Sequence, residues 1–559
     1  MRTMRLMLGV LVLFWAAGTL PADEQLPAFD SSWKEEYLPE DDAWKKLKQE
    51  LIFNNGAEPE TLDPAIMTGV TEHTLALALF EGLTMHHPET LEPKPGVAER
   101  WDISADQLTY VFRLRTDAKW SNGDTVTAEQ FLWSWYRAIV DPDCDYAYLF
   151  YYIKGVEDFH KTELKKPKDQ LTPAQFARFK NQCGVEALTS RQLRVTLRAP
   201  CAYFLDLASF ETYMPVHQAT VEKHPELKWT RPENFVGNGP FVLKEWSPRL
   251  KIVMVPNKHY WDRKIVKLTK VTALPQADID VSYNMFTKGE VHWIKTVPIA
   301  KLDEAKRTPE YFVTPYLGSY FYRFNTKRIP DKRVRKALSL AVDRASITRD
   351  VTRAGQIPAT WFCPEIVSAG YTPPKGIPYD PDLARKLLAE AGYPGGEGFQ
   401  KLTIFYNSSE DHKKVAERVG QMWKETLGIQ VSLQNAEWKV YLSQVEELDY
   451  DVARAGWIGD YGDPMTFLDM WVTGGGNNNT GWSNARYDEL IQKASREGDL
   501  KKRIAMLQEA ERIVIRDEFP ILPIYIYVNQ GMKVDALQGW YETVRDLHPF
   551  QFMYFEPDE

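Results

Sequence analysis

The stretch Asp451-Val-Ala-Arg-Ala-Gly-Trp-Ile-Gly-Asp-Tyr461 decides the fold of this chain, because it joins a strand to a loop rich in charged and aromatic side chains. Asp451 to Arg454 is typical of a short strand, and we expect the glycines that follow to turn the chain into a loop. Asp460 would then lie at a strand end, where α/β domains usually bind ligands. With Arg454 and Trp457 it suits a small zwitterion. Taken alone, however, the segment favours an ordinary Asp-rich turn with a core tryptophan.

Length and composition indicate a large globular protein. The chain has 559 residues, of which 44% are hydrophobic, which is enough for a core spread over about three or four units. The 18 Trp, 27 Tyr and 26 Phe residues are core material, and a surplus of Trp and Tyr also suits a large concave site. The net charge is −9 and we find no long basic run, so we expect no nucleic-acid partner.

Residues 1–22 are typical of a secretory signal peptide. Arg2 and Arg5 supply the charge, Leu6 to Ala17 is apolar, and Ala22 ends a cleavage-site pattern. The apolar stretch is shorter than the ~20 residues of a membrane-spanning helix, which disfavours an uncleaved anchor. None of the four cysteines lies near this segment to carry a lipid. We therefore expect an exported, soluble protein that is not a lipoprotein.

The four cysteines leave the disulfide pattern open, since export permits such bonds. Cys183 and Cys201 flank two predicted hairpin strands around the turn Thr189-Ser-Arg-Gln192, so a bridge between them is geometrically reasonable. Two free buried thiols are an equally good interpretation. Cys144 and Cys363 are too far apart in sequence to be paired by this argument.

Apolar periodicity predicts alternating strands and helices. Leu402 to Tyr406, a helix from about His412, and Ile429 to Leu433 form a strand-helix-strand unit, which implies a right-handed crossover and parallel strands. Ile521 to Val528 is apolar enough for a buried strand. We find no internal repeat and no low-complexity linker, so the domains are expected to be joined by strands, which suits a hinge.

Three local features carry narrower expectations. Thr127 and Gln130 have capping-box spacing at the start of a helix. Residues 23 to about 42 form an acidic leader that we expect to be mobile. His86 and His87 are adjacent and have no third ligand nearby in sequence, so a surface loop is expected rather than a metal site.

Short motifs in a fixed order run through nearly all of the chain after residue 22: Asn54-Asn-Gly, Leu62-Asp-Pro64, Trp120-Ser-Asn-Gly, Asn238-Gly-Pro, Val334-Arg-Lys-Ala-Leu, Ala389-Glu-Ala-Gly-Tyr393, Glu437-Trp-Lys and Val452-Ala-Arg-Ala-Gly-Trp457. No single motif is specific. Their order and spacing together resemble the periplasmic oligopeptide-binding proteins, which are extracellular solute-binding proteins of family 5 and serve ATP-driven importers.

This resemblance implies an α/β, periplasmic-binding-protein-like fold. Two hinged lobes with mixed sheets close around the ligand, and a smaller third domain is inserted in the first lobe. The implied division assigns residues 23–80, 205–317 and 528–559 to lobe I, 81–204 to the inserted small domain and 318–527 to lobe II. The family members bind a solute and are not enzymes, so neither a cofactor nor a metal is expected.

The resemblance also implies which residues hold a ligand. Asp460 matches an aspartate that holds the α-amino group of a peptide, and Arg454 matches an arginine able to receive a peptide C-terminus. The other predicted ligand-binding residues are Trp457, Trp438, His412, Asn407, Tyr527, Val70 and Tyr146.

Three departures from the family pattern concern the site. An arginine near the pocket tryptophan falls at Val445. A family disulfide is absent, since its positions fall at Gly318 and Ile458. A lysine used for longer peptides falls at Thr352, although the adjacent Arg353 is able to substitute for it. These departures affect the preferred length of the ligand rather than the amine contact.

Structural interpretations compete with each assigned role. His412 is equally suited to the N-terminus of a helix, and Trp438 and Trp457 to the core. Arg454 has structural carboxylates, such as Asp451 or Asp463, within reach along the chain.

The predicted function is that of an exported receptor in the periplasm. It would capture small peptides between two closing lobes and deliver them, as a monomer, to an inner-membrane ABC permease and its ATPase subunits. Alternatives within the binding class are a dipeptide, an oligosaccharide or a metal chelate, and a chaperone-like role is a third reading. An exported hydrolase is the rival class, for which we find no Gly-x-Ser-x-Gly or His-Glu-x-x-His motif.

Overall fold

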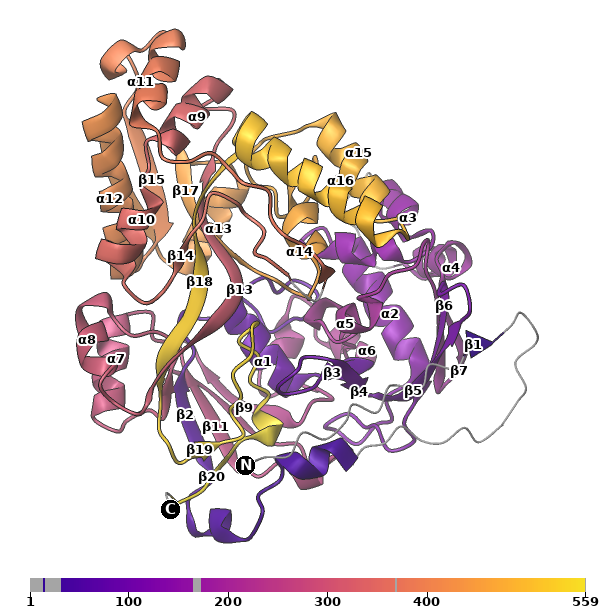
Figure 1. Cartoon of the computed structure of the whole chain (residues 1–559). Helices are drawn as coiled ribbons and strands as arrows, with labels where there is room; N and C mark the ends of the chain where they lie inside the picture. Colours follow the sequence, from indigo (N-terminus) through magenta and orange to yellow (C-terminus); the bar gives the residue numbers. More distant parts are fainter. Residues whose placement is uncertain (1–13, 16–31, 164–171, 367–368, 558–559) are drawn as a thin grey trace.

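The structure of the chain is a computed structural model (Figure 1). It describes residues 14–15, 32–163, 172–366 and 369–557. The predicted signal peptide therefore lies outside the described residues, apart from the two-residue strand β1 (Phe14–Trp15). No helix among the described residues is long and apolar enough to cross a membrane.

One mixed sheet of eleven strands runs through the molecule. In spatial order its strands are β16 (Val431–Ala436), β15 (Leu402–Asn407), β17 (Val452–Ile458), β13 (Tyr311–Phe324), β18 (Ile521–Lys533), β12 (Trp293–Ile294), β2 (Glu50–Asn54), β11 (Lys270–Leu274), β10 (Lys251–Pro256) and β9 (Phe241–Ser247), with β14 (Ile357–Pro358) beside β18. We call β12, β2, β11, β10 and β9 the first half of the sheet, and β16, β15 and β17 the second half. Each half contains three mutually parallel strands, β12-β2-β11 and β16-β15-β17.

The long strands β13 and β18 join the two halves (Figure 1). Up to Pro315, β13 pairs with the C-terminal part of β18, whose last two residues also pair with β12. From Ser319, it pairs with both β18 and β17. The register shifts between these two residues, and such an irregularity lets a strand bend. The shift lies at the start of the predicted lobe II, residues 318–527, where a hinge is needed; the division into domains stays a prediction.

A second sheet lies in the predicted inserted domain. Its strands, in order after β1, are β5 (Ala98–Ser104), β6 (Thr109–Leu114), β8 (Gln192–Thr196) and β7 (Val185–Thr189). The predicted hairpin is confirmed, because β7 and β8 pair in antiparallel fashion. The capping box is also confirmed: Gln130 Oε1 accepts the Thr127 N–H at 2.9 Å at the start of α2 (Ala128–Val140). All four cysteines are free and buried.

A buried ion pair ties α2 to the segment before the first helix. Arg137 on α2 donates from Nη1 to Asp63 Oδ1 at 3.0 Å and from Nη2 to Asp63 Oδ2. The Asp63 side chain is fully buried and Arg137 is 7% exposed. The pair therefore joins α2 to the segment between β2 and α1 by a contact that is shielded from water.

The helices that flank the cavity described below are α1 (Val70–Leu79), α7 (Ile279–Thr287), α12 (Glu410–Leu427) and α13 (Trp438–Glu446). Away from it lie α9 (Lys332–Leu340), α11 (Pro381–Glu390), α15 (Ala485–Ala494) and α16 (Leu500–Arg512). The predicted strand-helix-strand unit is confirmed as β15-α12-β16, with β15 and β16 parallel. Its helix starts two residues before His412, because Ser409 Oγ accepts the His412 N–H and ends the preceding loop.

Two local expectations are wrong. Residues 32–37 of the leader are docked: Lys34 is 5% exposed and its Nζ lies 2.7 Å from Asp262 Oδ2, a buried partner that local sequence does not reveal. His86 and His87 are buried rather than on a surface loop, with His86 in β3 (Thr84–His86). The described residues contain no group of His, Cys, Asp and Glu side chains able to hold a metal ion.

Candidate functional site

A cavity of about 950 Å³ lies between the two halves of the sheet. Its lining includes residues at or just after the carboxyl ends of the parallel strands in both halves. Pro275 and Lys295 follow β11 and β12; Asn407 ends β15, while Trp438 and Asp460 follow β16 and β17. Carboxyl ends of parallel strands are the usual ligand sites of α/β sheets. The carboxyl ends of the parallel strands in both halves therefore face the same cavity.

All nine predicted ligand-binding residues line this one cavity, although they are spread over more than four hundred and fifty positions of the chain: Val70, Tyr146, Asn407, His412, Trp438, Arg454, Trp457, Asp460 and Tyr527. The structure thus brings the predicted set together. Their role as ligand contacts stays a prediction.

Asp460 follows β17 and has few partners for its charge. Thr466 Oγ1 donates to Asp460 Oδ2 at 3.1 Å and accepts the Asp460 N–H at 2.9 Å. Burial, and then the nearby carboxylate of Glu211, raise the pKa of Asp460 well above its usual value. A cationic ligand group here would stabilise the ionised carboxylate.

Two basic side chains that line the same cavity, Arg545 and His73, already have acidic partners. Arg545 donates to the main-chain oxygen of Asp460, and its Nη1 lies 3.0 Å from Asp206 Oδ1. His73 Nδ1 lies 2.6 Å from Glu211 Oε2. The sequence interpretation missed Arg545 and Glu211, because neither stands in a motif and both reach the site only through the tertiary fold.

Arg454, on β17, is surrounded by uncharged groups. Its Nη1 donates to Asn407 Oδ1 at 3.3 Å and its Nη2 to the Tyr527 hydroxyl, while the guanidinium carbon lies 4.7 Å from the centre of the Tyr320 ring. Its buried Nε has no hydrogen-bond partner. A guanidinium is always charged, so Arg454 presents a positive charge that these neutral contacts leave unmatched.

The structural interpretation of Arg454 is wrong, because the carboxylates near it along the chain are paired elsewhere. Asp463 forms an ion pair with Arg503 at 2.7 Å, and Asp451 lies 3.3 Å from Arg328. Arg353, the substitute for the missing lysine, likewise pairs with Asp303 at 2.7 Å. The Arg353 side chain is therefore not available to a ligand in the cavity.

His412 lies in the first turn of α12, 5.7 Å from the Tyr320 ring. Burial, and then the charge of Arg454, hold the pKa of His412 well below its usual value. The imidazole is therefore neutral at pH 7 and offers one donor and one acceptor. It is a hydrogen-bonding group rather than a second cation.

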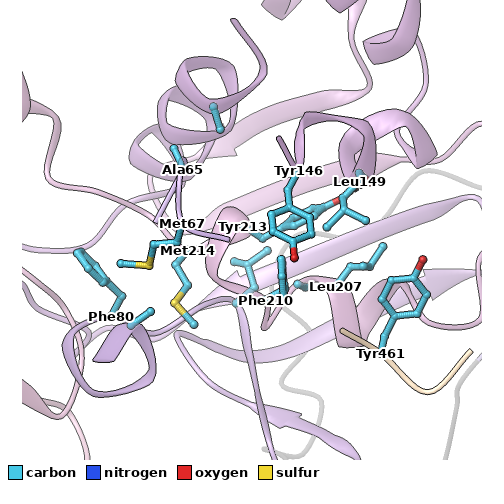
Figure 2. Packing of buried hydrophobic residues seen from close by; sticks show 14 of the residues in the cluster. Ala65, Met67, Phe80, Tyr146, Leu149, Leu207, Phe210, Tyr213, Met214 and Tyr461 are labelled. Atoms are coloured by element: carbon cyan, nitrogen blue, oxygen red, sulfur yellow. Dashed lines mark hydrogen bonds between the residues drawn. The ribbon is translucent and has the colours of Figure 1, made fainter. Parts of the chain in front are cut away.

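Several aromatic residues among the nine predicted ligand-binding residues also pack against the hydrophobic core. Trp457 is 8% exposed and its Nε1 donates to the Thr466 main-chain oxygen at 2.7 Å. Tyr146 lies 6.2 Å from Trp457 and 5.1 Å from Phe210, and Figure 2 shows it among the buried side chains around Leu149 and Phe210. Trp438 stacks on Tyr441 at 6.0 Å. These rings make rigid apolar walls around the charged groups.

The loop predicted after Arg454 does not begin at Gly456, because β17 continues to Ile458. A Cβ at this position would lie 2.5 Å from the Tyr527 hydroxyl and 3.3 Å from Arg454 Nη2. Glycine suits this position because the side chains of Tyr527 on β18 and Arg454 on β17 both approach it closely. Pairing with β13 keeps this segment extended.

A third acidic position of the cavity is Asp145, on which the charge of Glu446 in α13 acts. Asp145 precedes Tyr146, and burial followed by the charge of Glu446 raises the pKa of Asp145 to about 7. Both carboxylates line the cavity. Of the charges that act on Asp145, Asp143 and Glu60 raise its pKa and Arg323 lowers it.

This environment predicts a pH-dependent stability. An unfolded aspartate titrates near ~3.9, so between about pH 4 and pH 7 the folded protein binds the extra proton and the free energy of unfolding falls as the pH rises. Asp145→Asn removes this effect. Its melting temperature should exceed that of the wild type by a margin that grows up to pH 7 and then stays constant. Glu417→Gln, at an exposed carboxylate on α12, is the control; an equal pH trend in both differences would contradict the prediction.

Comparison with known proteins gives one consistent family. The family described as bacterial extracellular solute-binding proteins, family 5 Middle, matches residues 92–479. The oligopeptide-binding protein OppA of Bacillus subtilis is 34% identical over 88% of this chain and 90% of its own length. The periplasmic murein peptide-binding protein MppA of Escherichia coli is 37% identical over 88% of this chain and 90% of its own length.

Solved structures agree in fold. The murein tripeptide binding protein MppA of Escherichia coli superimposes with a TM-score of 0.84 at 35% identity, covering 91% of this chain and 99% of that one. The Haemophilus influenzae OppA complex with the peptide RPPGFSPFR gives 0.84 at 33% identity over the same shares. The unliganded open form of MppA gives a TM-score of only 0.61 at 36% identity, covering 91% of this chain and 97% of that one. The halves of this chain are therefore arranged unlike those of that open form.

Proposed function

This chain belongs to the bacterial extracellular solute-binding proteins of family 5, and from that premise we propose that it captures oligopeptides as the receptor of an ABC importer. The family consists of binding proteins, so the chain binds its solute without chemical conversion. One observation carries the proposal: an under-partnered carboxylate and an unpaired guanidinium, Asp460 and Arg454, line the same cavity between two halves of a sheet.

The proposed binding mode uses these charges at the ligand ends. Asp460 holds the α-amino group of the peptide, and Arg454, with Asn407 and Tyr527, receives a carboxylate. A charge-assisted bond contributes about 1.5–3 kcal/mol, whereas micromolar affinity requires about 8 kcal/mol. The remainder comes from main-chain hydrogen bonds and from burial against Trp438 and the other rings, which tolerate different side chains. Such a site is selective for peptide termini more than for peptide sequence.

Closure of the halves is coupled to binding. A ligand shifts an equilibrium between open and closed forms only if it binds the closed form more tightly. Val70 and Tyr146 line the cavity from outside the second half, and Asp460 and Arg454 from within it. A peptide that contacts both sets stabilises the closed form, and the register shift in β13 gives the strands a place to bend.

The remaining assignments follow the same proposal. The closed receptor delivers its peptide to an inner-membrane permease with ATPase subunits. It is exported to the periplasm by the signal in residues 1–22, carries no lipid and works as a monomer. The names of the relatives from Escherichia coli, which include the word periplasmic, support the location.

Calorimetry with blocked and free peptides tests the proposal. The mature protein is titrated with a mixed pool of tri- to pentapeptides and with the same pool acetylated at the N-terminus. Binding of the free pool, with a loss of about tenfold or more on acetylation, is expected from the missing charge-assisted bond. If no free peptide binds, the peptide assignment is wrong, and oligosaccharides and metal chelates are then the ligands to test.

A further inference from the structure

Lys295 is a cavity-lining cation that the proposed binding mode does not use. It follows β12, whose Ile294 pairs in parallel with Asn54 at the end of β2. Lys295 and Asn55 therefore stand at the same carboxyl edge of the first half. Arg454 belongs to the second half, so the two cations approach the ligand space from opposite halves of the sheet.

The contacts of Lys295 are to uncharged groups. Its Nζ donates to Thr74 Oγ1 at 2.8 Å and to Asn55 Oδ1 at 3.5 Å, and it lies 5.4 Å from the centre of the Trp293 ring. An ammonium has three donors, so one remains available. Among the described residues, Lys295 forms no ion pair.

The acidic side chain that acts on Lys295 is Asp546, and its carboxylate already has other hydrogen-bonding partners. Asp546 acts on Lys295 electrostatically without an ion pair. Asp546 Oδ1 accepts a hydrogen bond from Asn529 Nδ2 at 2.6 Å and lies 2.5 Å from His548 Nε2. Burial lowers the pKa of Lys295. A charge taken from water without a close partner costs free energy, and a carboxylate supplied by a ligand would offset that cost.

The position where the family pattern places a lysine does not supply such a charge. Thr352 lines the cavity, but its hydroxyl donates to Gln356 Oε1 at 2.8 Å. Its neighbour Arg353 is paired with Asp303. Neither Thr352 nor Arg353 therefore offers a cation to a ligand carboxylate in this cavity.

We propose that Lys295 is a second carboxylate-binding position of the cavity, which receives the C-terminal carboxylate of a peptide or the side chain of an aspartate or glutamate within it. This inference rests on the proposed function and adds ligand selectivity to it. Because Lys295 and Asp460 lie in different halves, a peptide that uses both also favours closure.

Lys295→Met tests the assignment, since methionine keeps an unbranched apolar stem without the charge. Wild type and variant are titrated with two ligand series. The first contains peptides of three to six residues, each as free acid and as C-terminal amide. The second contains peptide amides that carry either glutamate or glutamine at each position in turn. Lys288→Met, an exposed lysine after α7 and outside the cavity lining, is the matched control.

The expected result is a loss of acid preference, by about tenfold to a hundredfold, in at least one series for Lys295→Met and in neither for Lys288→Met. A loss confined to the free-acid series identifies the C-terminus as the group bound, and a loss confined to the glutamate series identifies a side chain. Unchanged acid preference in both series, with peptides still bound, overturns the assignment. So does an equal weakening of acids and amides, which indicates a structural role. Failure of the wild type to bind any peptide refutes the proposed function instead.

Discussion

Asp460→Asn is expected to weaken the binding of free tri- to pentapeptides by about tenfold to a hundredfold, because a charge-assisted bond to the peptide amine contributes about 1.5–3 kcal/mol. Asparagine still offers an oxygen to the hydroxyl of Thr466, so the loop after β17 is expected to keep its shape. The melting temperature of the unliganded variant should equal or exceed that of the wild type, since a partly buried carboxylate with few partners has been neutralised. Calorimetry and thermal unfolding of the same samples measure both effects.

The pH dependence of affinity separates the charge of Asp460 from its shape. Because the pKa of Asp460 is raised in the unliganded site, lowering the pH protonates the carboxylate and should weaken amine binding in the wild type. The Asp460→Asn variant should lack this component. Asp449→Asn, at an exposed carboxylate just before β17, is the control and should bind as the wild type does. Wild-type affinity in Asp460→Asn would refute the amine contact.

Asp63→Ala is expected to lower the free energy of unfolding by about 3–5 kcal/mol, because it leaves the buried guanidinium of Arg137 without its partner. The substitution also removes the carboxylate oxygen that accepts the Ala65 N–H at 3.1 Å. Urea denaturation, followed by tryptophan fluorescence, measures the change.

Two variants show whether burial is the cause. Glu186→Ala breaks an exposed ion pair with Arg194 in the small sheet, and about 1 kcal/mol or less is expected. The double variant Asp63→Leu/Arg137→Met, which removes both charges, should recover much of the lost stability. An equal cost for Asp63→Ala and Glu186→Ala would contradict the argument.

Local sequence was sufficient where local physics determines the structure. The capping box at Thr127 and the β15-α12-β16 unit depend on residues within one or two elements of each other, and both are confirmed. The continuation of β17 through Gly456 was missed, because β13 lies far away in the sequence. Lys34 was assigned to a mobile leader for the same reason, since its partner Asp262 is a distant residue.

The candidate site shows the same limit. Asp460 and Arg454 were found because they stand in a recognisable motif. Lys295 and Glu211 carry no local pattern, and their place in the cavity follows from the meeting of strand ends and helices that the sequence does not join. Chemical type alone cannot distinguish Lys295 from the many lysines on the surface. What distinguishes it is a partly buried position in the cavity lining without an ion pair to any described residue.

The order in which the chain is synthesised bears on the large sheet. β18 is the last of its strands in the sequence, yet it lies between β13 and β12 in the middle. A growing chain that stops before Ile521 would hold two separate groups of strands, each with an unpaired edge, and the space between them would have no fixed width. The ligand cavity is therefore one of the last features that a nascent chain can complete, and premature termination anywhere before β18 should yield a product without a binding site.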